Sequence, residues 1–191
     1  MGKIIFAIIS RVHSFLLRNH HGFGTNFRVA YGARLLIPKN SYFKIGADFF
    51  AGERLYISTN EFVPIEIGSG IMMGPEVMIL GGNHDYKSKD AHMRYHSKHN
   101  ESCKGILIED GAWIGARAIL LSGTQIQEGS IIAAGSVVSK AVLPYAVYGG
   151  VPAKFIKKRF ENPEDLKILL KNVNSTYSIE DIIKLYRKNG F

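Results

Sequence analysis

The sequence of 191 residues has one cysteine, Cys103, and no long hydrophobic run. A single cysteine excludes an internal disulfide and a zinc site built from several thiolates, which is compatible with a reducing cytosol. The apolar run Ile4–Ile9 has six residues, far fewer than the roughly 20 needed to span a bilayer. No small-residue cleavage site follows this run, so neither a transmembrane helix nor a secretory signal is expected. Cys103 lies in a polar segment and is interpreted as an incidental free thiol rather than a nucleophile.

Acidic residues are fewer than basic ones, 16 against 24, and the formal net charge is +8. This excess indicates anionic partners, and nucleic acid, anionic lipid or a phosphate-bearing cofactor each fit. Because the basic residues gather in the C-terminal part and no nucleic-acid recognition motif occurs, a nucleic-acid partner is not expected.

Residues 1–22 are predicted to form an amphipathic N-terminal helix. Its apolar stripe comprises Ile4, Ile5, Ile8, Ile9, Val12, Phe15 and Leu16, and Lys3, Arg11, Ser14 and Arg18 lie off it. Such a helix either caps the fold or lies on a membrane surface, and capping is the more common use.

An internal repeat with a period of six dominates the rest of the chain. Aliphatic residues recur at Ile108, Ile114, Leu120, Ile126, Ile132 and Val138, and small residues follow four places later at Ala112, Ala118, Thr124, Ser130 and Ser136. An earlier block repeats the spacing at Ile45, Ala51 and Ile57, then at Ile67, Met73 and Ile79. Helices and alternating strands have periods of 3.6 and 2, so neither explains the pattern. A parallel β-helix with three flat faces does, since each unit is a short strand plus a corner. Glycine tolerates the tight corners, which accounts for 20 glycines.

Two interruptions break the register. Four extra residues fall between Ile57 and Ile67, around Asn60 and Pro64. The longer one, residues 81–105, is polar, rich in histidine and aperiodic, so it is predicted to form an external loop that carries the chemistry. The predicted organisation is therefore a helix at 1–22, a β-helix at 23–143 with this loop, a cofactor-binding tail at 144–160 and a helical segment at 161–191. Within the last segment, Ser178 to Asp181 is typical of a capping box.

With these features in order, the chain resembles the hexapeptide-repeat acyltransferases, and most of all the maltose, galactoside and polysaccharide O-acetyltransferases. The segments that carry the resemblance are 73–79 leading to 82–85, then 112–116, 132–140 and 149–154. The resemblance implies an all-β, single-stranded left-handed parallel β-helix, direct acetyl transfer from acetyl-CoA to a saccharide hydroxyl, and a homotrimer with sites between subunits.

The family's general base corresponds to His84. An imidazole suits the task because a sugar hydroxyl must lose its proton as it attacks the thioester. Asn83 and Asp85 flank this base, and either is a candidate for binding the acceptor or orienting the ring. Some relatives supply an acceptor-binding Asn about thirty residues earlier, where this chain has Glu53, Arg54 and Tyr56.

The other histidines are weaker candidates for the chemistry. His13, His20 and His21 precede the repeat. His92, His96 and His99 have spacings of four and three, which would suit metal ligands on a helical turn, but no Cys or firmly placed carboxylate completes the set. The γ-type carbonic anhydrases bind zinc through histidines of adjoining coils, and the repeat units here contain no second histidine. No metal is therefore expected.

The resemblance places acetyl-CoA contacts at Ala116, Ala134, Ser139, Lys140, Lys154 and Lys157. Small residues let the pantetheine arm approach the backbone, and lysines at the end of the solenoid suit the phosphates of the nucleotide. The alternative for these lysines, together with Lys158 and Arg159, is a solvated basic surface.

The expected function is thus acetyl transfer to a cell-surface polysaccharide or its precursor, in the cytoplasm or at the inner face of a membrane. Other acceptors remain open within the class: an amino sugar, serine or an antibiotic. A non-catalytic β-helix used as a scaffold or binding module is the alternative from another class.

Overall fold

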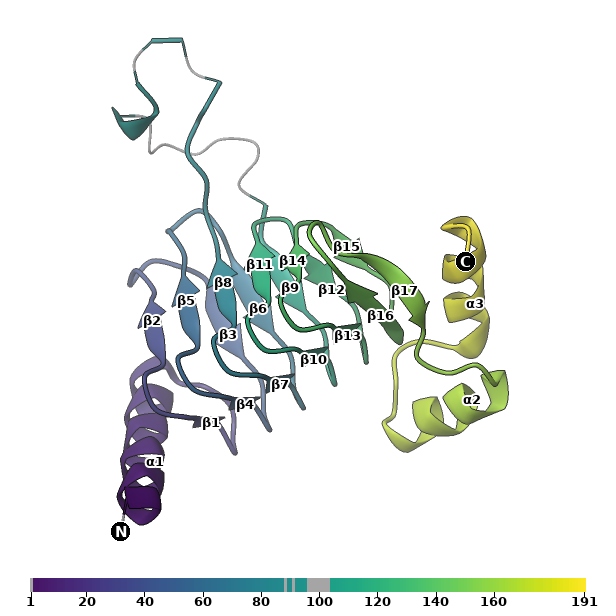
Figure 1. Ribbon diagram of the computed structural model, residues 1–191, viewed down its shortest axis with the longest axis horizontal. Coiled ribbons are helices and arrows are strands. Elements are labelled where there is room, and N and C mark those ends of the chain that lie inside the picture. Colours follow the sequence, from purple (N-terminus) through teal and green to yellow (C-terminus); the bar gives the residue numbers. More distant parts are fainter. Residues whose placement is uncertain (1, 88, 91, 96–103) are drawn as a thin grey trace.

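The computed structural model describes residues 2–87, 89–90, 92–95 and 104–191 (Figure 1). A solenoid of short strands occupies the middle, with the helix α1 (Gly2–His21) at one end and the helices α2 (Pro163–Asn172) and α3 (Ile179–Lys188) at the other. A 3₁₀ turn, η1 (Met93–Tyr95), lies in the loop that leaves the solenoid between β8 and β9.

Three sheets form the faces of the solenoid, and successive strands of the chain visit them in turn. Sheet A holds β1 (Arg28–Val29), β4 (Phe50–Ala51), β7 (Met72–Met73), β10 (Trp113–Ile114), β13 (Ile131–Ile132), β16 (Ala146–Gly149) and β17 (Lys154–Lys158). Sheet B holds β2 (Arg34–Leu36), β5 (Tyr56–Ser58), β8 (Met78–Leu80), β11 (Ile119–Leu121) and β14 (Val137–Val138). Sheet C holds β3 (Phe43–Ile45), β6 (Ile65–Ile67), β9 (Ile106–Ile108), β12 (Gln125–Ile126) and β15 (Ala141–Val142). Every strand pairs in parallel with its neighbours except β17, which folds back antiparallel on β16. The predicted left-handed parallel β-helix is confirmed.

The core is a stack of the aliphatic residues that the period of six selects. All twelve are buried, at 3% exposure or less: Ile45, Ala51, Ile57, Ile67, Met73, Ile79, Ile108, Ile114, Leu120, Ile126, Ile132 and Val138. Strand neighbours align these side chains from coil to coil, as in the pairs Ile79–Leu120 and Leu120–Val138. Burying a side chain of this size contributes about 1.5–3 kcal/mol, so the stacked row is the main stabilising feature.

The small interior residues are also placed as the repeat predicts. Thr124, Ser130 and Ser136 are fully buried. The Thr124 hydroxyl donates a hydrogen bond to the carbonyl of Val138 (2.9 Å), and the Ser136 hydroxyl donates to the carbonyl of Ala133 (2.7 Å). Each polar group therefore enters the core with a partner, which avoids the cost of an unsatisfied buried hydroxyl.

The C-terminal helices close the far end of the core. Leu166, Leu170 and Ile182 join the buried cluster. The predicted capping box at the start of α3 is present: Ser178 accepts a hydrogen bond from the Asp181 backbone, and the Asp181 carboxylate accepts one from the Ser178 backbone. The Tyr186 hydroxyl lies within hydrogen-bond distance of two carbonyls, Pro144 (2.8 Å) and Tyr145 (2.9 Å).

At the other end, α1 packs on β1, but not through the apolar stripe that the sequence favours for capping. The docking residues are Ser14, which is buried, and Leu17, which packs against the core. The Ser14 hydroxyl donates to the carbonyl of Val29 (3.0 Å) and accepts from its N–H (2.9 Å). The described members of the stripe are exposed, and the side chains of Ile4 and Ile5 lie outside the described set.

Candidate active site

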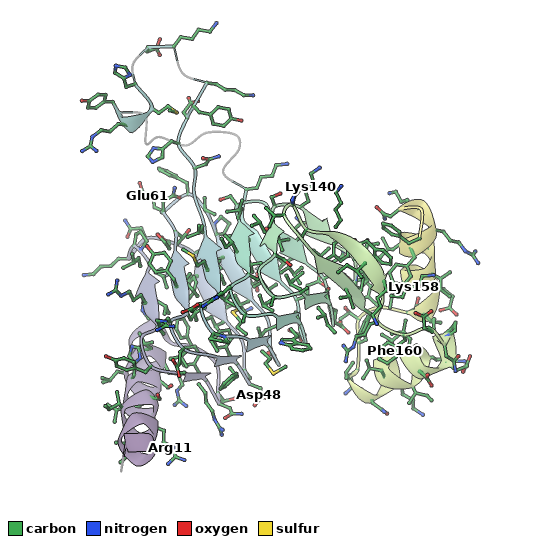
Figure 2. The ribbon with its side chains drawn as sticks, in the orientation of Figure 1. Arg11, Asp48, Glu61, Lys140, Lys158 and Phe160 are labelled. Carbon is green, nitrogen blue, oxygen red and sulfur yellow. The ribbon has the colours of Figure 1, made fainter. Side chains whose placement is uncertain are left out.

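His84 lies near the start of the loop between β8 and β9, and its side chain is exposed. The loop projects away from the solenoid (Figure 2). Its first residues are tied to neighbouring coils: the N–H of Gly82 donates to the Ser122 hydroxyl (2.7 Å), and the N–H of Gly81 donates to the Ser58 carbonyl (2.7 Å). Gly82 has a φ of +106°, and a Cβ there would lie 2.7 Å from the Asn60 amide nitrogen. The first residues of the loop are therefore held in one position, and this restrains the position of His84, two residues after Gly82.

Asn83 and Asp85 hold the backbone of this turn. The Asn83 side-chain oxygen accepts a hydrogen bond from the N–H of His84 (3.0 Å), and the Asp85 carboxylate accepts one from the N–H of Lys87 (3.0 Å). The Asp85 contact reaches the N–H two residues on, as in an Asx turn, and the Asn83 contact reaches the next residue. These two residues shape the turn around His84.

A groove of about 920 Å³ runs along the corner between sheets A and B, where the chain passes from β4 to β5, β7 to β8, β10 to β11 and β13 to β14. Ala116 and Ala134 both line it, as do Met73, Gly74 and Pro75. The coils approach closely here, since a Cβ on Gly74 would lie 2.6 Å from the Ala116 nitrogen. The two alanines that the family resemblance assigns to the cofactor thus line one groove.

An ion-pair ladder crosses the same groove, and the sequence did not predict it. Glu76 accepts hydrogen bonds from Arg54, one coil earlier, and from the Arg117 Nε (2.6 Å), one coil later. All three residues take the left-handed corner conformation, with φ of 57°, 59° and 59° for Arg54, Glu76 and Arg117. The hydrogen bond from Arg117, and then that from Arg54, lowers the pKa of the Glu76 carboxyl. Arg54, Glu76 and Arg117 all line the groove.

The remaining cofactor candidates lie toward the C-terminal end of the solenoid. Ser139, Lys140 and Lys154 line a hollow of about 190 Å³ between the corner after β14 and the β16–β17 hairpin. Lys157 lies farther along β17, opposite Val147, and does not line this hollow. Arg159 instead donates a hydrogen bond to the Gly129 carbonyl (3.0 Å), and Lys158 lies over the Tyr186 ring at 5.4 Å. Lys158 and Arg159 therefore have structural contacts of their own.

The candidate metal ligands are only partly described. His92 is exposed beside η1, whereas His96, His99 and Cys103 lie outside the described residues. Within the described ranges, no group of three or more His, Cys, Asp or Glu side chains is placed to hold a metal ion.

Sheet B separates the candidate base from the candidate groove. Ala116 and Ala134 precede β11 and β14, at one edge of the sheet, whereas His84 follows β8, at the opposite edge. Lys140 lies on the same edge as the His84 loop (Figure 2). A three-residue strand spans about 10 Å, much more than the roughly 3 Å that proton transfer requires. The His84 edge and the groove edge of one chain are thus apart.

Comparisons with known proteins agree with this fold. The family model of bacterial transferase hexapeptide (six repeats) matches residues 105–140. Over 122 residues the chain is 33% identical to a Schizosaccharomyces pombe protein named as an acetyltransferase, covering 61% of this chain and 56% of that protein. The crystal structure of a maltose O-acetyltransferase from Clostridium difficile 630 has a TM-score of 0.52 at 28% identity, covering 69% of this chain and 71% of that one.

A more distant structure shares the fold alone. It is a mutant N-acyltransferase from Bacillus cereus, solved with a dTDP-linked amino sugar and coenzyme A, with a TM-score of 0.57 at 17% identity, covering 79% of this chain and 90% of that one. The chain spans about half the length of the curated relatives that it matches.

Proposed function

The chain belongs to the hexapeptide-repeat acetyltransferase family, and on that premise we propose that it transfers an acetyl group from acetyl-CoA to a saccharide hydroxyl. The observation that carries this proposal is the combination of a hexapeptide solenoid with a long inserted loop that presents an exposed histidine. A scaffold of stacked coils has no need of such a loop.

His84 acts as the general base in this proposal. The imidazole takes the proton of the acceptor hydroxyl as the hydroxyl oxygen bonds to the acetyl carbon. The carbon–sulfur bond then breaks, and the departing thiolate recovers the proton from the imidazolium. The reaction leaves an acetyl ester and free CoA, and it requires no covalent enzyme intermediate. The hydrogen bond between Gly82 and Ser122 at the start of the loop supports this role. It restrains the loop, and a catalytic proton acceptor must be held within hydrogen-bond reach of the reacting group.

Acetyl-CoA binding is assigned to the groove and to the C-terminal hollow. The apolar floor around Ala116 and Ala134 suits the pantetheine arm. Lys140 and Lys154 stand at the hollow near the end of the solenoid, where their ammonium groups would meet the phosphates. Lys157 does not line this hollow, so its part in binding rests on the family resemblance alone.

A second copy of the chain completes the site in this proposal. The outer face of sheet B is mostly apolar, with Met78, Ile119 and Val137 in one register row and Leu80 and Leu121 in the next. The matching row of sheet C holds Lys44, Glu66, Leu107, Gln125 and Ala141, and is therefore more polar. Sheet A also has an apolar row, with Phe50, Met72 and Trp113, but sheet B is the one that has the His84 loop at one edge and the groove at the other. Three copies with their sheets B turned toward a threefold axis bring the His84 edge of one chain to the groove edge of the next. The proposed enzyme is thus a homotrimer with its active sites between chains.

A saccharide is the favoured acceptor because the Clostridium difficile relative is a maltose O-acetyltransferase, and the structural match covers more than two thirds of each of the two chains. Thiol release from acetyl-CoA should be measured with a panel of acceptors: free glycosides, nucleotide sugars, lipid-linked sugars, amino sugars, serine and chloramphenicol. Thiol release above the acceptor-free rate with a hydroxyl sugar, and an acetyl ester in the product, is the expected result. If turnover occurs only with an amine acceptor, O-transfer is wrong. If no acceptor gives thiol release and acetyl-CoA does not bind, the scaffold alternative replaces the enzyme.

A further inference from the structure

The helix α1 presents its apolar side to solvent. Its docking contacts come from Ser14 and Leu17. The outward side chains are 44–60% exposed and comprise Ile8, Ile9, Val12, Phe15 and Leu16. Five large apolar side chains on one side of one helix form a contiguous patch, which is rare on a protein surface without a partner.

A basic hollow adjoins this patch. It has a volume of about 670 Å³ and lies between α1 and the first strands of sheet A. Arg11 and Arg18 of α1 and Arg28 of β1 line it, and its lining contains no carboxylate. Within the part of the chain that the structure describes, none of these arginines forms an ion pair, in contrast to Arg54 and Arg117. Ser10 also lines the hollow, and its buried hydroxyl oxygen has no hydrogen-bond partner among the described residues. The hollow is therefore suited to an anion with several acceptor oxygens.

The hollow and the apolar patch meet on one side of the helix. Arg11 and Arg18 are seven residues apart, so they lie on the same side of α1, and Phe15 lies between them in sequence. Phe15 belongs to the exposed patch and also lines the hollow. A ligand that fills both places is an amphiphile, with an anionic head in the hollow and an apolar body against the helix. Figure 2 labels Arg11 on α1.

We propose that α1 docks the protein on an anionic phospholipid surface, with its apolar patch in the interface and lipid phosphates held by Arg11, Arg18 and Arg28. The helix does not cross the bilayer, because none of the described helices is long and apolar enough to do so. Charge favours a lipid surface over a second copy of the chain, because a symmetric contact through this face would bring the three arginines of one copy against those of the other without a carboxylate between them.

The test is co-sedimentation of the full chain with vesicles of phosphatidylcholine alone and of phosphatidylcholine with 30 mol% phosphatidylglycerol, a composition of about one anionic lipid in three. Binding is expected to the anionic vesicles, to weaken as salt is raised, and to persist in millimolar inorganic phosphate. If phosphate alone abolishes vesicle binding at constant ionic strength, the hollow is a site for free phosphate and the membrane proposal is wrong.

Two sets of variants separate the parts of the surface. Arg11→Gln, Arg18→Gln and Arg28→Gln together should weaken binding to anionic vesicles at least about tenfold. The matched control removes three charges from α2 and α3, with Lys171→Gln, Lys184→Gln and Arg187→Gln, and should leave binding within about twofold of wild type. Phe15→Ser with Leu16→Ser should abolish vesicle binding while leaving the circular dichroism spectrum unchanged.

Three further results would overturn the proposal. Equal binding to neutral and anionic vesicles would show that the arginines of the hollow do not bind lipid phosphates. Equal losses of binding in the two triple variants would show that only the net charge of the protein matters. Analytical ultracentrifugation gives the third, because a change of oligomeric state in the Phe15 and Leu16 variant would make the patch a contact between copies. None of these readouts depends on acetyl transfer, so the membrane proposal is tested independently of the proposed function.

Discussion

His84 follows β8 and Ala116 precedes β11, so the two residues lie at opposite edges of sheet B. The two strands are paired in parallel, with Ile79 opposite Leu120, and this register places the ends of both strands at the same level. When identical chains pack side by side through this sheet, the proposed base of one chain can meet the groove of the next chain.

Replacing the proposed base should remove catalysis without removing the cofactor. His84→Ala is expected to lower kcat about 10²–10⁴-fold, because a positioned general base contributes that much. The dissociation constant for CoA, measured by calorimetry, should stay within twofold of wild type, since the proposed contact of His84 is with the acceptor hydroxyl and not with the cofactor. His92→Ala is the matched control, an exposed histidine of the same loop. Undiminished turnover in His84→Ala would show that another group takes the proton.

The two lysines of the C-terminal hollow should act on the phosphates of the cofactor alone. Lys140→Gln with Lys154→Gln is expected to raise KM for acetyl-CoA about tenfold, the cost of losing charge-assisted hydrogen bonds. With S-acetylpantetheine, which lacks phosphates, the same variant should match wild type. Lys171→Gln on α2 controls for net charge. An equal rise in KM with acetyl-CoA and with S-acetylpantetheine would show that the two lysines do not act through the phosphates.

The ladder through Glu76 should stabilise the fold only where its carboxyl is ionised. Because Arg117 and Arg54 hold the pKa of Glu76 below its ordinary value, the stabilisation is fully present above that ordinary value, near 4.5, and is lost as pH falls through the lowered pKa. Glu76→Gln should therefore lower Tm at pH 7, and the difference from wild type should shrink toward pH 3. Glu61→Gln, an exposed carboxylate near β5, is the control. A Tm difference for Glu76→Gln that is the same at pH 7 and pH 3 would contradict the ladder's role.

The Tyr186 hydroxyl should hold α3 on the last coil. Burial raises the pKa of Tyr186 to about 12, so the hydroxyl remains protonated and able to donate to the carbonyls of Pro144 and Tyr145. Tyr186→Phe is expected to lower the free energy of unfolding by about 1–3 kcal/mol, because the Pro144 carbonyl loses its hydrogen-bond donor, whereas the Tyr145 carbonyl keeps the N–H of Arg159. Denaturant unfolding measures this change. A loss below about 0.5 kcal/mol would mean that water takes the place of the hydroxyl.

The spacing of six predicted the inward residues because a β-helix repeats one local geometry, and each unit can be recognised without knowing its neighbours. For that reason, the six aliphatic residues at this spacing from Ile108 to Val138 are buried as expected. The pairing of Glu76 with Arg117 follows from the same stacking, but the residues are 41 positions apart because the His84 loop lies between them. Aligning charged corner residues coil by coil would have found it.

The orientation of α1 could not be predicted from its apolar stripe. That prediction assumes that the largest apolar face meets the protein core. The side that docks is set instead by one serine, since Ser14 satisfies both the N–H and the carbonyl of Val29 in a buried position. The arrangement of Lys140 and Lys154 around one hollow likewise depends on the antiparallel return of β17, which carries no repeat signal.

The shared active site is tested most directly by mixing two inactive variants. His84→Ala removes the base, and Ala134→Trp fills the groove at an exposed position. In oligomers formed from equal amounts of both, one site in four combines an intact base from one chain with an intact groove from the next, so about a quarter of wild-type activity should return. If each site uses the base and groove of a single chain, the mixture will stay as inactive as the separate variants.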